Sequence, residues 1–274
     1  MRILTAFLLS ITLGSAAWAQ APATPGGVNV GEASKLRQLV PADQIEQAGT
    51  QQYGQMMQEA ASKGALAPPN HPQLQRLRAI ATRILPYTTR FNSRAQNWKW
   101  EVNLVGSKQL NAFCLPGGKI AFYTGLIDGL KLTDDEIAIV MGHEIAHALR
   151  EHARARIAKS QLTHGAAAIA SQLLSGTKYG GLADLGLRGG AELLTLRFSR
   201  DDESDADVVG LDLAARAGYD PRAGITLWQK MGAASKGAPP QWLSTHPAGK
   251  NRIAEIEQHL PEVMPVYEAA RKQR

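Results

Sequence analysis

The chain has 274 residues, a formal net charge of +6 and a single cysteine, Cys114. One cysteine cannot close an internal disulfide, so the stability of the fold must come from a hydrophobic core and, if one is bound, a metal ion. The basic residues are spread along the chain without an aromatic stacking platform or a recognition motif, which argues against nucleic-acid binding.

The first 19 residues have the features of a cleaved signal peptide. Arg2 supplies a short positive region, an apolar run follows over residues 3–13, and Ala17-Trp18-Ala19 provides the small-residue pattern of a signal-peptidase site. The apolar run is about half the ~20 residues that a membrane-spanning helix needs. We therefore expect cleavage after Ala19 and a periplasmic protein with no transmembrane span in the mature chain. Peripheral contact with a membrane stays open.

Residues 20–70 are predicted to form a flexible lead-in and an N-terminal helix ahead of the main domain, which we place at 71–274. The segment 20–33 is rich in proline, glycine and alanine, as flexible segments are. One helix is expected over 41–63. A second is expected over 71–85, where apolar residues recur at helical spacing before Pro86.

The pattern changes near residue 98. Apolar and polar side chains alternate over 98–104, which predicts a half-buried strand, and 120–123 is a second short strand candidate. After Thr133 the pattern is helical, with glycine-rich interruptions over 176–190 and 232–240. The predicted fold class is therefore α+β, a mainly helical domain with a small β-sheet.

A helix is expected to begin after Thr133, because Thr133 and Glu136 have the spacing of a capping box. It carries the sequence His143-Glu144-Ile145-Ala146-His147. Residues four apart project from one helix face, so both imidazoles can reach one ion. Glu144 lies beside them and can take a proton from a water at an open metal position. The motif predicts one Zn²⁺ per chain, held by His143, His147 and a third protein ligand.

The third ligand is expected from a later helix. His152 lies nine residues past His143, and we place it nearly on the opposite side of the helix, either in solvent or in contact with a ligand. Glu203 and Asp207 are four apart, so Glu203 can bind the ion while Asp207 accepts the far N–H of a ligand imidazole. The acidic run also fits an ordinary helix start, which is our interpretation of Asp201, Asp202 and Asp205.

Four stretches of the chain resemble the HtpX-like and CAAX-prenyl-endopeptidase-type gluzincins, peptidase family forty-eight of clan MA. They are Asn111 to Gly118, Gly142 to His147, Ser199 to Asp207, and Ser244 to Ile253, in the order of the family. The likeness covers roughly residues 71–260. It is strongest to the periplasmic branch that includes BepA and LoiP, and to the mitochondrial stress protease of the inner membrane. It implies a zincin-like metallopeptidase domain over 71–274 with a small sheet beside the active-site helix.

The resemblance also implies roles for single residues. Glu203 becomes the third zinc ligand, and His246 faces the zinc site, either to stabilise the oxyanion or to bind the metal in a latent form. A substrate-binding edge strand is implied over Asn111, Ala112, Phe113, Cys114 and Leu115, to which an extended peptide can add by backbone hydrogen bonds. For Cys114 itself we expect a small buried hydrophobe rather than a redox role.

The expected function is a zinc-dependent endopeptidase that hydrolyses unfolded or misfolded envelope proteins through a zinc-activated water, with Glu144 as general base. Two alternatives stay open: a zinc-binding chaperone or assembly factor with incidental peptidase activity, and a hydrolase of compounds other than peptides. Glu144 argues against the first alternative, because a binding protein needs no base beside an open metal position. The edge strand argues against the second.

Overall fold

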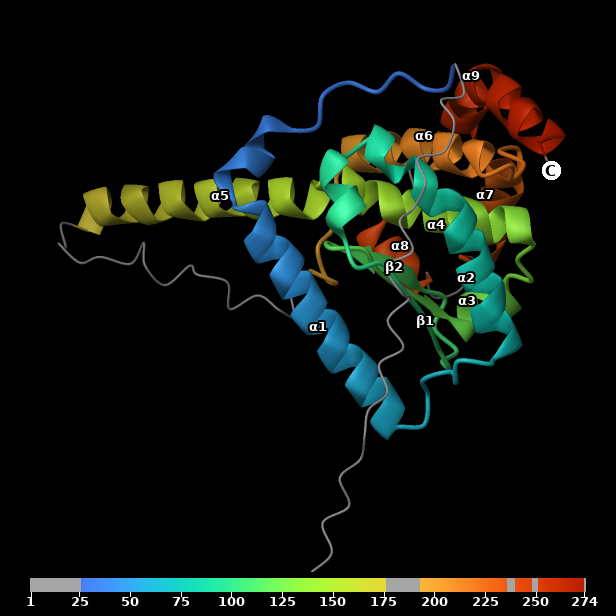
Figure 1. Cartoon of the computed structure of the whole chain (residues 1–274). Helices are drawn as coiled ribbons and strands as arrows, with labels where there is room; N and C mark the ends of the chain where they lie inside the picture. The colour runs from blue at the N-terminus through green and yellow to red at the C-terminus, as the bar shows by residue number, and fades with distance from the viewer. Residues whose placement is uncertain (1–25, 176–192, 236–239, 248–250, 274) are drawn as a thin grey trace, which may run out of the picture.

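The computed structural model describes residues 26–175, 193–235, 240–247 and 251–273 (Figure 1). The predicted signal peptide and the glycine-rich stretch over 176–190 lie outside these residues. The helices are α1 (Ala42–Ser62), α2 (Pro72–Ile84), α3 (Thr124–Gly129), α4 (Asp134–Leu149), α5 (His152–Ser175), α6 (Arg200–Arg216), α7 (Ala223–Ala234), α8 (Gln241–Thr245) and α9 (Arg252–Lys272). Short 3-10 helices cover Lys35–Leu39, Leu85–Arg90 and Ser93–Asn97. Within the described ranges, no helix combines the length and hydropathy that a bilayer span requires.

A small sheet accompanies the helices, which confirms the α+β class. Its strands are β1 (Glu101–Val105), β2 (Ala112–Leu115) and β3 (Lys119–Tyr123), in the spatial order β1-β3-β2. β1 runs parallel to β3 and β2 runs antiparallel to it, so β2 lies at an edge. The β2–β3 turn needs glycine at 118, where φ is 79° and a Cβ would come within 2.7 Å of the Trp100 ring.

The first strand is shorter than predicted. It starts at Glu101, whose N–H donates to Gly118 O, and not at residue 98. Trp98 and Trp100 alternate with polar residues because both rings turn into the core, 5.3 Å apart, before the strand pairing begins. The two buried tryptophans thus give residues 98–100 the alternating pattern of a strand although they are not paired in the sheet.

The described part of the predicted lead-in, from residue 26 onward, contacts the helices. Val28 is buried, and its N–H donates to Asp212 Oδ1 at 3.2 Å. Arg216 on α6 donates to Gly26 O at 2.6 Å. These buried polar contacts satisfy the backbone of a segment that has no secondary structure of its own.

The two helices that form the centre of the molecule, α4 and α6, lie side by side in Figure 1. They approach backbone to backbone, because a Cβ at Gly142 would lie 2.6 Å from Gly210 O and one at Gly210 would lie 2.7 Å from His143 N. Any larger side chain at either position would push the helices apart. The close crossing brings the first turns of α6 against the motif on α4.

Candidate metal centre

Four buried side chains from three helices converge on one point. His143 and His147 project from α4, Glu203 from the first turn of α6, and His246 follows the last residue of α8. One ligand atom from each lies within 4.8 Å of all the others. His143 Nε2 is 3.1 Å from His147 Nε2 and 3.3 Å from His246 Nδ1, which in turn is 3.1 Å from Glu203 Oε1.

These separations suit a four-coordinate cation. Zinc bonds to nitrogen and oxygen of about 2.0–2.1 Å give a tetrahedron with edges of about 3.3–3.4 Å. The neighbouring ligand atoms of the cluster lie 3.1–3.6 Å apart. Three imidazoles aimed at one another cannot all be paired by hydrogen bonds when they are neutral, whereas a divalent cation satisfies every lone pair. The residues present therefore fit a zinc ion by both distance and donor type.

Glu203 is supported by a strong helix start. Ser199 and Asp202 form a capping box at the beginning of α6. Asp202 is therefore part of an acidic helix start, as predicted. Burial alone would raise the pKa of Glu203. The neighbouring His147 and His246 rings outweigh that effect and hold the pKa of Glu203 well below its ordinary value. A carboxylate that stays ionised while 1% exposed is suited to a metal ion.

Asp207 lies one turn after Glu203 and contacts the far side of the His143 ring. Its Oδ1 is 2.9 Å from His143 Nδ1. Arg252 of α9 donates to Asp207 and, at 2.5 Å, to Glu203 Oε2, so one guanidinium joins both carboxylates. Burial opposes ionisation, but the Arg252 charge and the hydrogen bond to His143 keep the pKa of Asp207 low. The sequence marked Arg252 only as part of a motif, with no role of its own.

His152 is not on the opposite side of α4, as the sequence had suggested. α4 ends at Leu149, Glu151 adopts a φ of 56°, and α5 starts at His152. The turn brings the His152 ring back to the metal centre, where its Nδ1 lies 2.9 Å from His147 Nδ1. The ring is 5% exposed, so the solvated alternative is wrong.

Asp205 is also more than an acidic residue in a helix start. Its Oδ2 lies 3.0 Å from His152 Nε2 and accepts a 2.6 Å hydrogen bond from Arg150 Nε. Asp205, paired with Arg150, thus contacts the His152 ring at Nε2, on the side away from His147.

Glu144 is buried beside the cluster but does not belong to it. Its Oε1 accepts a 2.5 Å hydrogen bond from Trp242 Nε1 on α8. His246 Nε2 lies 3.6 Å from the same oxygen. α8 is fixed at both ends, because Trp242 N–H donates to Leu110 O and Phe198 N–H donates to Thr245 O, each at 3.1 Å.

A groove leads along β2 to this centre. The cavity measures about 260 Å³ and reaches Glu144, His147 and His246. One wall is formed by the predicted substrate-binding residues Asn111, Ala112, Phe113, Cys114 and Leu115, and the other by 193–196 and Phe198. Burial raises the pKa of the Cys114 thiol well above its ordinary value, which fits a hydrophobic side chain rather than a reactive one.

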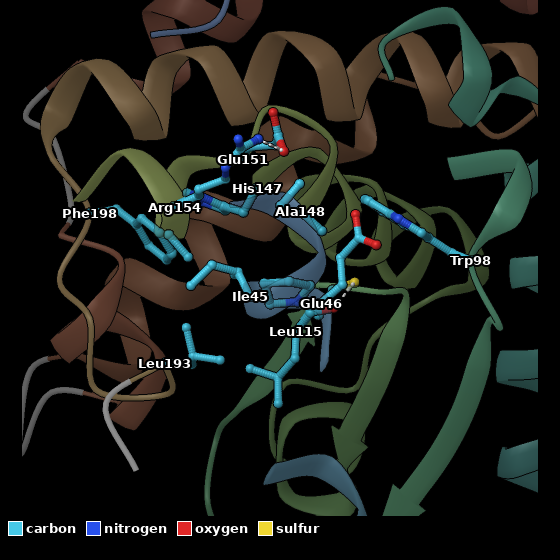
Figure 2. Close-up of a pocket in the computed structure, with 14 residues that line it drawn as sticks. Ile45, Glu46, Trp98, Leu115, His147, Ala148, Glu151, Arg154, Leu193 and Phe198 are labelled. Atoms are coloured by element: carbon cyan, nitrogen blue, oxygen red, sulfur yellow. Dashed lines mark hydrogen bonds and ion pairs between the residues drawn. The ribbon is translucent and has the colours of Figure 1, made fainter. Parts of the chain in front are cut away.

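A small apolar pocket adjoins the groove next to His147. In Figure 2 the side chains of Ile45, Leu115, Leu193 and Phe198 converge around it, and His147 lies at its border. Phe198 also stacks on the His147 ring with the centroids 3.9 Å apart. The pocket is thus positioned to accept an apolar side chain from a chain that lies along β2.

Comparisons with known proteins agree with this geometry. The model of peptidase family M48 matches residues 71–260. The mitochondrial metalloendopeptidase OMA1 of Schizosaccharomyces pombe is 35% identical over 214 residues, which cover 77% of this chain and 59% of that protein. OMA1 of Arabidopsis thaliana is 38% identical over 177 residues, covering 64% of this chain and 35% of that one. The metalloprotease LoiP of Escherichia coli is 29% identical over 209 residues, 75% of this chain and 78% of LoiP.

The match to the two OMA1 proteins is partial in length. It spans 35% and 59% of their sequences, whereas most of LoiP is covered.

Proposed function

The chain belongs to peptidase family M48, and we propose that its metalloendopeptidase domain is a zinc-dependent enzyme that hydrolyses unfolded or misfolded envelope proteins. The observation that carries the proposal is the position of the buried His143, His147 and Glu203 cluster, with Glu144 beside it, at the end of the groove along β2. A base, a candidate metal centre and an edge strand of the described sheet meet at one place.

In this proposal His143 Nε2, His147 Nε2 and the Glu203 carboxylate hold the ion. Bound Zn²⁺ supplies a Lewis acid that polarises the scissile carbonyl and acidifies a water. Glu144 takes the proton of the attacking water and passes it to the leaving amine nitrogen. Asp207 contacts Nδ1 of His143 and thereby holds the orientation of that ring.

The groove favours an extended polypeptide. One side of β2 pairs with β3, and the other side faces the groove, where a peptide backbone can add as a further strand. Recognition through the backbone places few demands on sequence. The adjacent apolar pocket favours segments with large apolar side chains, which folded proteins bury and unfolded proteins expose.

His246 supports a latent resting state. Its Nδ1 lies within the ligand cluster, 3.1 Å from Glu203 Oε1 and 3.3 Å from His143 Nε2. With an ion held by His143, His147 and Glu203, His246 Nδ1 would be a fourth protein ligand at this corner and would exclude the water that hydrolysis needs. Activity would then require His246 to leave the corner. From its displaced position the ring can donate to the oxyanion of the tetrahedral intermediate.

The test compares wild-type and Glu144→Gln protein, both loaded with zinc, on an unfolded protein such as casein and on a folded one. Wild type should cleave casein and spare the folded protein, and Glu144→Gln should cleave neither. A proteomic comparison of envelope proteins that accumulate with each variant then identifies substrates. If neither protein cleaves any polypeptide but both promote refolding, the chaperone function is the correct one.

Export to the periplasm is part of the proposal and rests on residues 1–19. The intact mass of the mature protein should correspond to a chain that begins at Gln20, recovered after osmotic shock. A retained N-terminus in the membrane fraction would contradict export as a soluble protein.

A further inference from the structure

A chain of buried hydrogen bonds leads away from the metal centre through His147. His147 Nδ1 lies 2.9 Å from His152 Nδ1, and His152 Nε2 lies 3.0 Å from Asp205 Oδ2. Arg150 Nε donates to the same Asp205 oxygen at 2.6 Å. Every ring nitrogen of the two histidines thus faces either a polar partner or the ligand cluster.

When both rings are neutral, donor and acceptor chemistry allows one assignment of the hydrogens. The Asp205 carboxylate, paired with the Arg150 guanidinium, can only accept, so His152 carries its hydrogen on Nε2. A neutral His152 then presents a lone pair at Nδ1, which must accept from Nδ1–H of His147. This leaves the lone pair of His147 on Nε2, the atom that lies 3.1 Å from His143 Nε2 and 3.4 Å from Glu203 Oε1.

We propose that His152 is a positioning residue that accepts the Nδ1–H of His147 and thereby holds His147 in its metal-binding tautomer and ring orientation. The inference rests on the proposed role of His147 as a ligand. It assigns to a histidine the task that a carboxylate performs for the other imidazole, since Asp207 contacts His143 directly.

A neutral partner has a physical advantage at this position. Glu144, Glu203 and Asp207 already bring three carboxylates to the buried centre. A fourth in direct contact with His147 would add repulsion among like charges in a poorly solvated site. With His152 between them, the Asp205 carboxylate stays one imidazole ring away from His147. Asp205 still holds the hydrogen of His152 on Nε2, which leaves Nδ1 of His152 to accept from His147.

Ion pairs and a hydrogen bond to other segments hold the turn that leads into His152. Glu151, whose φ of 56° reverses the chain, pairs with Arg154 at 2.6 Å and with Arg37 at 2.9 Å. Arg150 also donates to Gly31 O at 2.6 Å. The position of the His152 ring is therefore set by contacts to the N-terminal segment as well as by α5.

Two variants of similar shape isolate the hydrogen bond. His152→Asn places an amide oxygen close to the position of Nδ1 and keeps an acceptor for His147, whereas His152→Leu has the same branching and no acceptor. We expect His152→Leu to weaken zinc binding by about 10–100-fold, measured by competition with a chelator, and His152→Asn to stay within about threefold of wild type. The absorption spectrum of the Co²⁺-substituted protein should change in the Leu variant only.

Nitrogen-15 NMR of the histidines in the zinc-loaded wild type provides a test that needs no variant to fold. The His147 ring should be protonated at Nδ1 and the His152 ring at Nε2. A His152 ring protonated at Nδ1 would overturn the proposal. So would equal losses of zinc affinity in both variants, or wild-type affinity in His152→Leu. Unchanged zinc binding in His147→Ala would instead overturn the metal centre itself, which keeps the two failures distinct.

Discussion

The indole N–H of Trp242 donates a 2.5 Å hydrogen bond to Glu144 Oε1, so the proposed general base already has a partner in the structure. Trp242 is 1% exposed, and its ring stacks on His246 with the centroids 4.9 Å apart. One short helix, α8, therefore contacts both the base and the fourth corner of the ligand cluster. Any movement of α8 changes the two together.

Glu144→Gln should abolish cleavage without disturbing this arrangement. Glutamine keeps an oxygen that can accept from Trp242, but it cannot take a proton from water. We expect the rate of casein cleavage to fall by about 10²–10⁴-fold, the range for general acid–base catalysis. Elemental analysis should still find about one zinc per chain. Substantial activity in this variant would show that the base is another residue.

Loss of a ligand should remove the metal as well as the activity. His143→Ala, His147→Ala and Glu203→Gln each leave two of the three proposed zinc ligands, and we expect zinc content well below one per chain after dialysis. Asp201→Asn is a matched control for Glu203→Gln, because Asp201 is in the same first turn of α6 but exposed. Full zinc occupancy in Glu203→Gln would mean that the third ligand is misassigned.

Chelation should lower the melting temperature. An ion that binds only the folded chain adds to the free energy of unfolding, and its removal leaves three buried imidazoles and a carboxylate without their common partner. Calorimetry of wild type and Glu144→Gln should show equal decreases on adding a chelator. His147→Ala should show almost none, since it has no tightly bound metal to lose.

Local patterns made α4 predictable. The capping box of Thr133 and Glu136 is present in the structure, and the spacing of His143 and His147 depends only on the pitch of one helix. Helix α3 was not expected, because its six residues are too few for a helical period to appear in the sequence.

The surroundings of the motif could not be derived from local patterns. The predicted position of His152 differs from the observed one because α4 ends at a turn in which Glu151 has a positive φ. Glycine or asparagine at this position would indicate such a turn in the sequence, whereas glutamate does not. The contacts of Trp242 with Glu144 and of Arg252 with Glu203 join residues far apart in the chain. Such pairs depend on how helices pack and have no local signature.

The start of α4 should make the fold sensitive to acid. Glu136 is 2% exposed and accepts hydrogen bonds from Thr133 N–H, Thr226 Oγ1 and Lys230 Nζ at 2.6–2.8 Å. Burial opposes ionisation, but these partners keep the pKa of Glu136 below its ordinary value of 4.5. A depressed pKa in the folded state means that the carboxylate stabilises the fold above about pH 4.5, and that this contribution is lost as the pH falls through the folded-state value.

Glu136→Gln should therefore lower the free energy of unfolding by about 1–3 kcal/mol at pH 7, and the difference from wild type should shrink between about pH 5 and pH 3. Urea unfolding with a chelator present keeps metal release out of the measurement. Asp134→Asn is the control, since Asp134 lies in the same turn with its side chain 60% exposed and should have little effect. A difference that stays constant with pH would contradict the ionised state of Glu136.

The last prediction concerns His246 and the resting state. His246→Ala removes Nδ1 from the fourth corner of the cluster while His143, His147 and Glu203 still hold the metal. If His246 keeps the enzyme latent, basal cleavage of casein by the zinc-loaded protein should rise several-fold, because water gains the corner that the imidazole occupied. Ser244→Ala, an exposed change on α8 two residues before His246, should leave the rate unaltered.

The double variant His246→Ala with Glu144→Gln decides whether any gain arises at this site. It should be inactive, because the opened corner is of no use without the base. A decrease of orders of magnitude in His246→Ala alone would show that the imidazole serves the transition state and does not restrain the resting enzyme. The stacking of Trp242 on His246 predicts a further sign of release: tryptophan fluorescence should change on substrate binding in wild type and should change much less in His246→Ala.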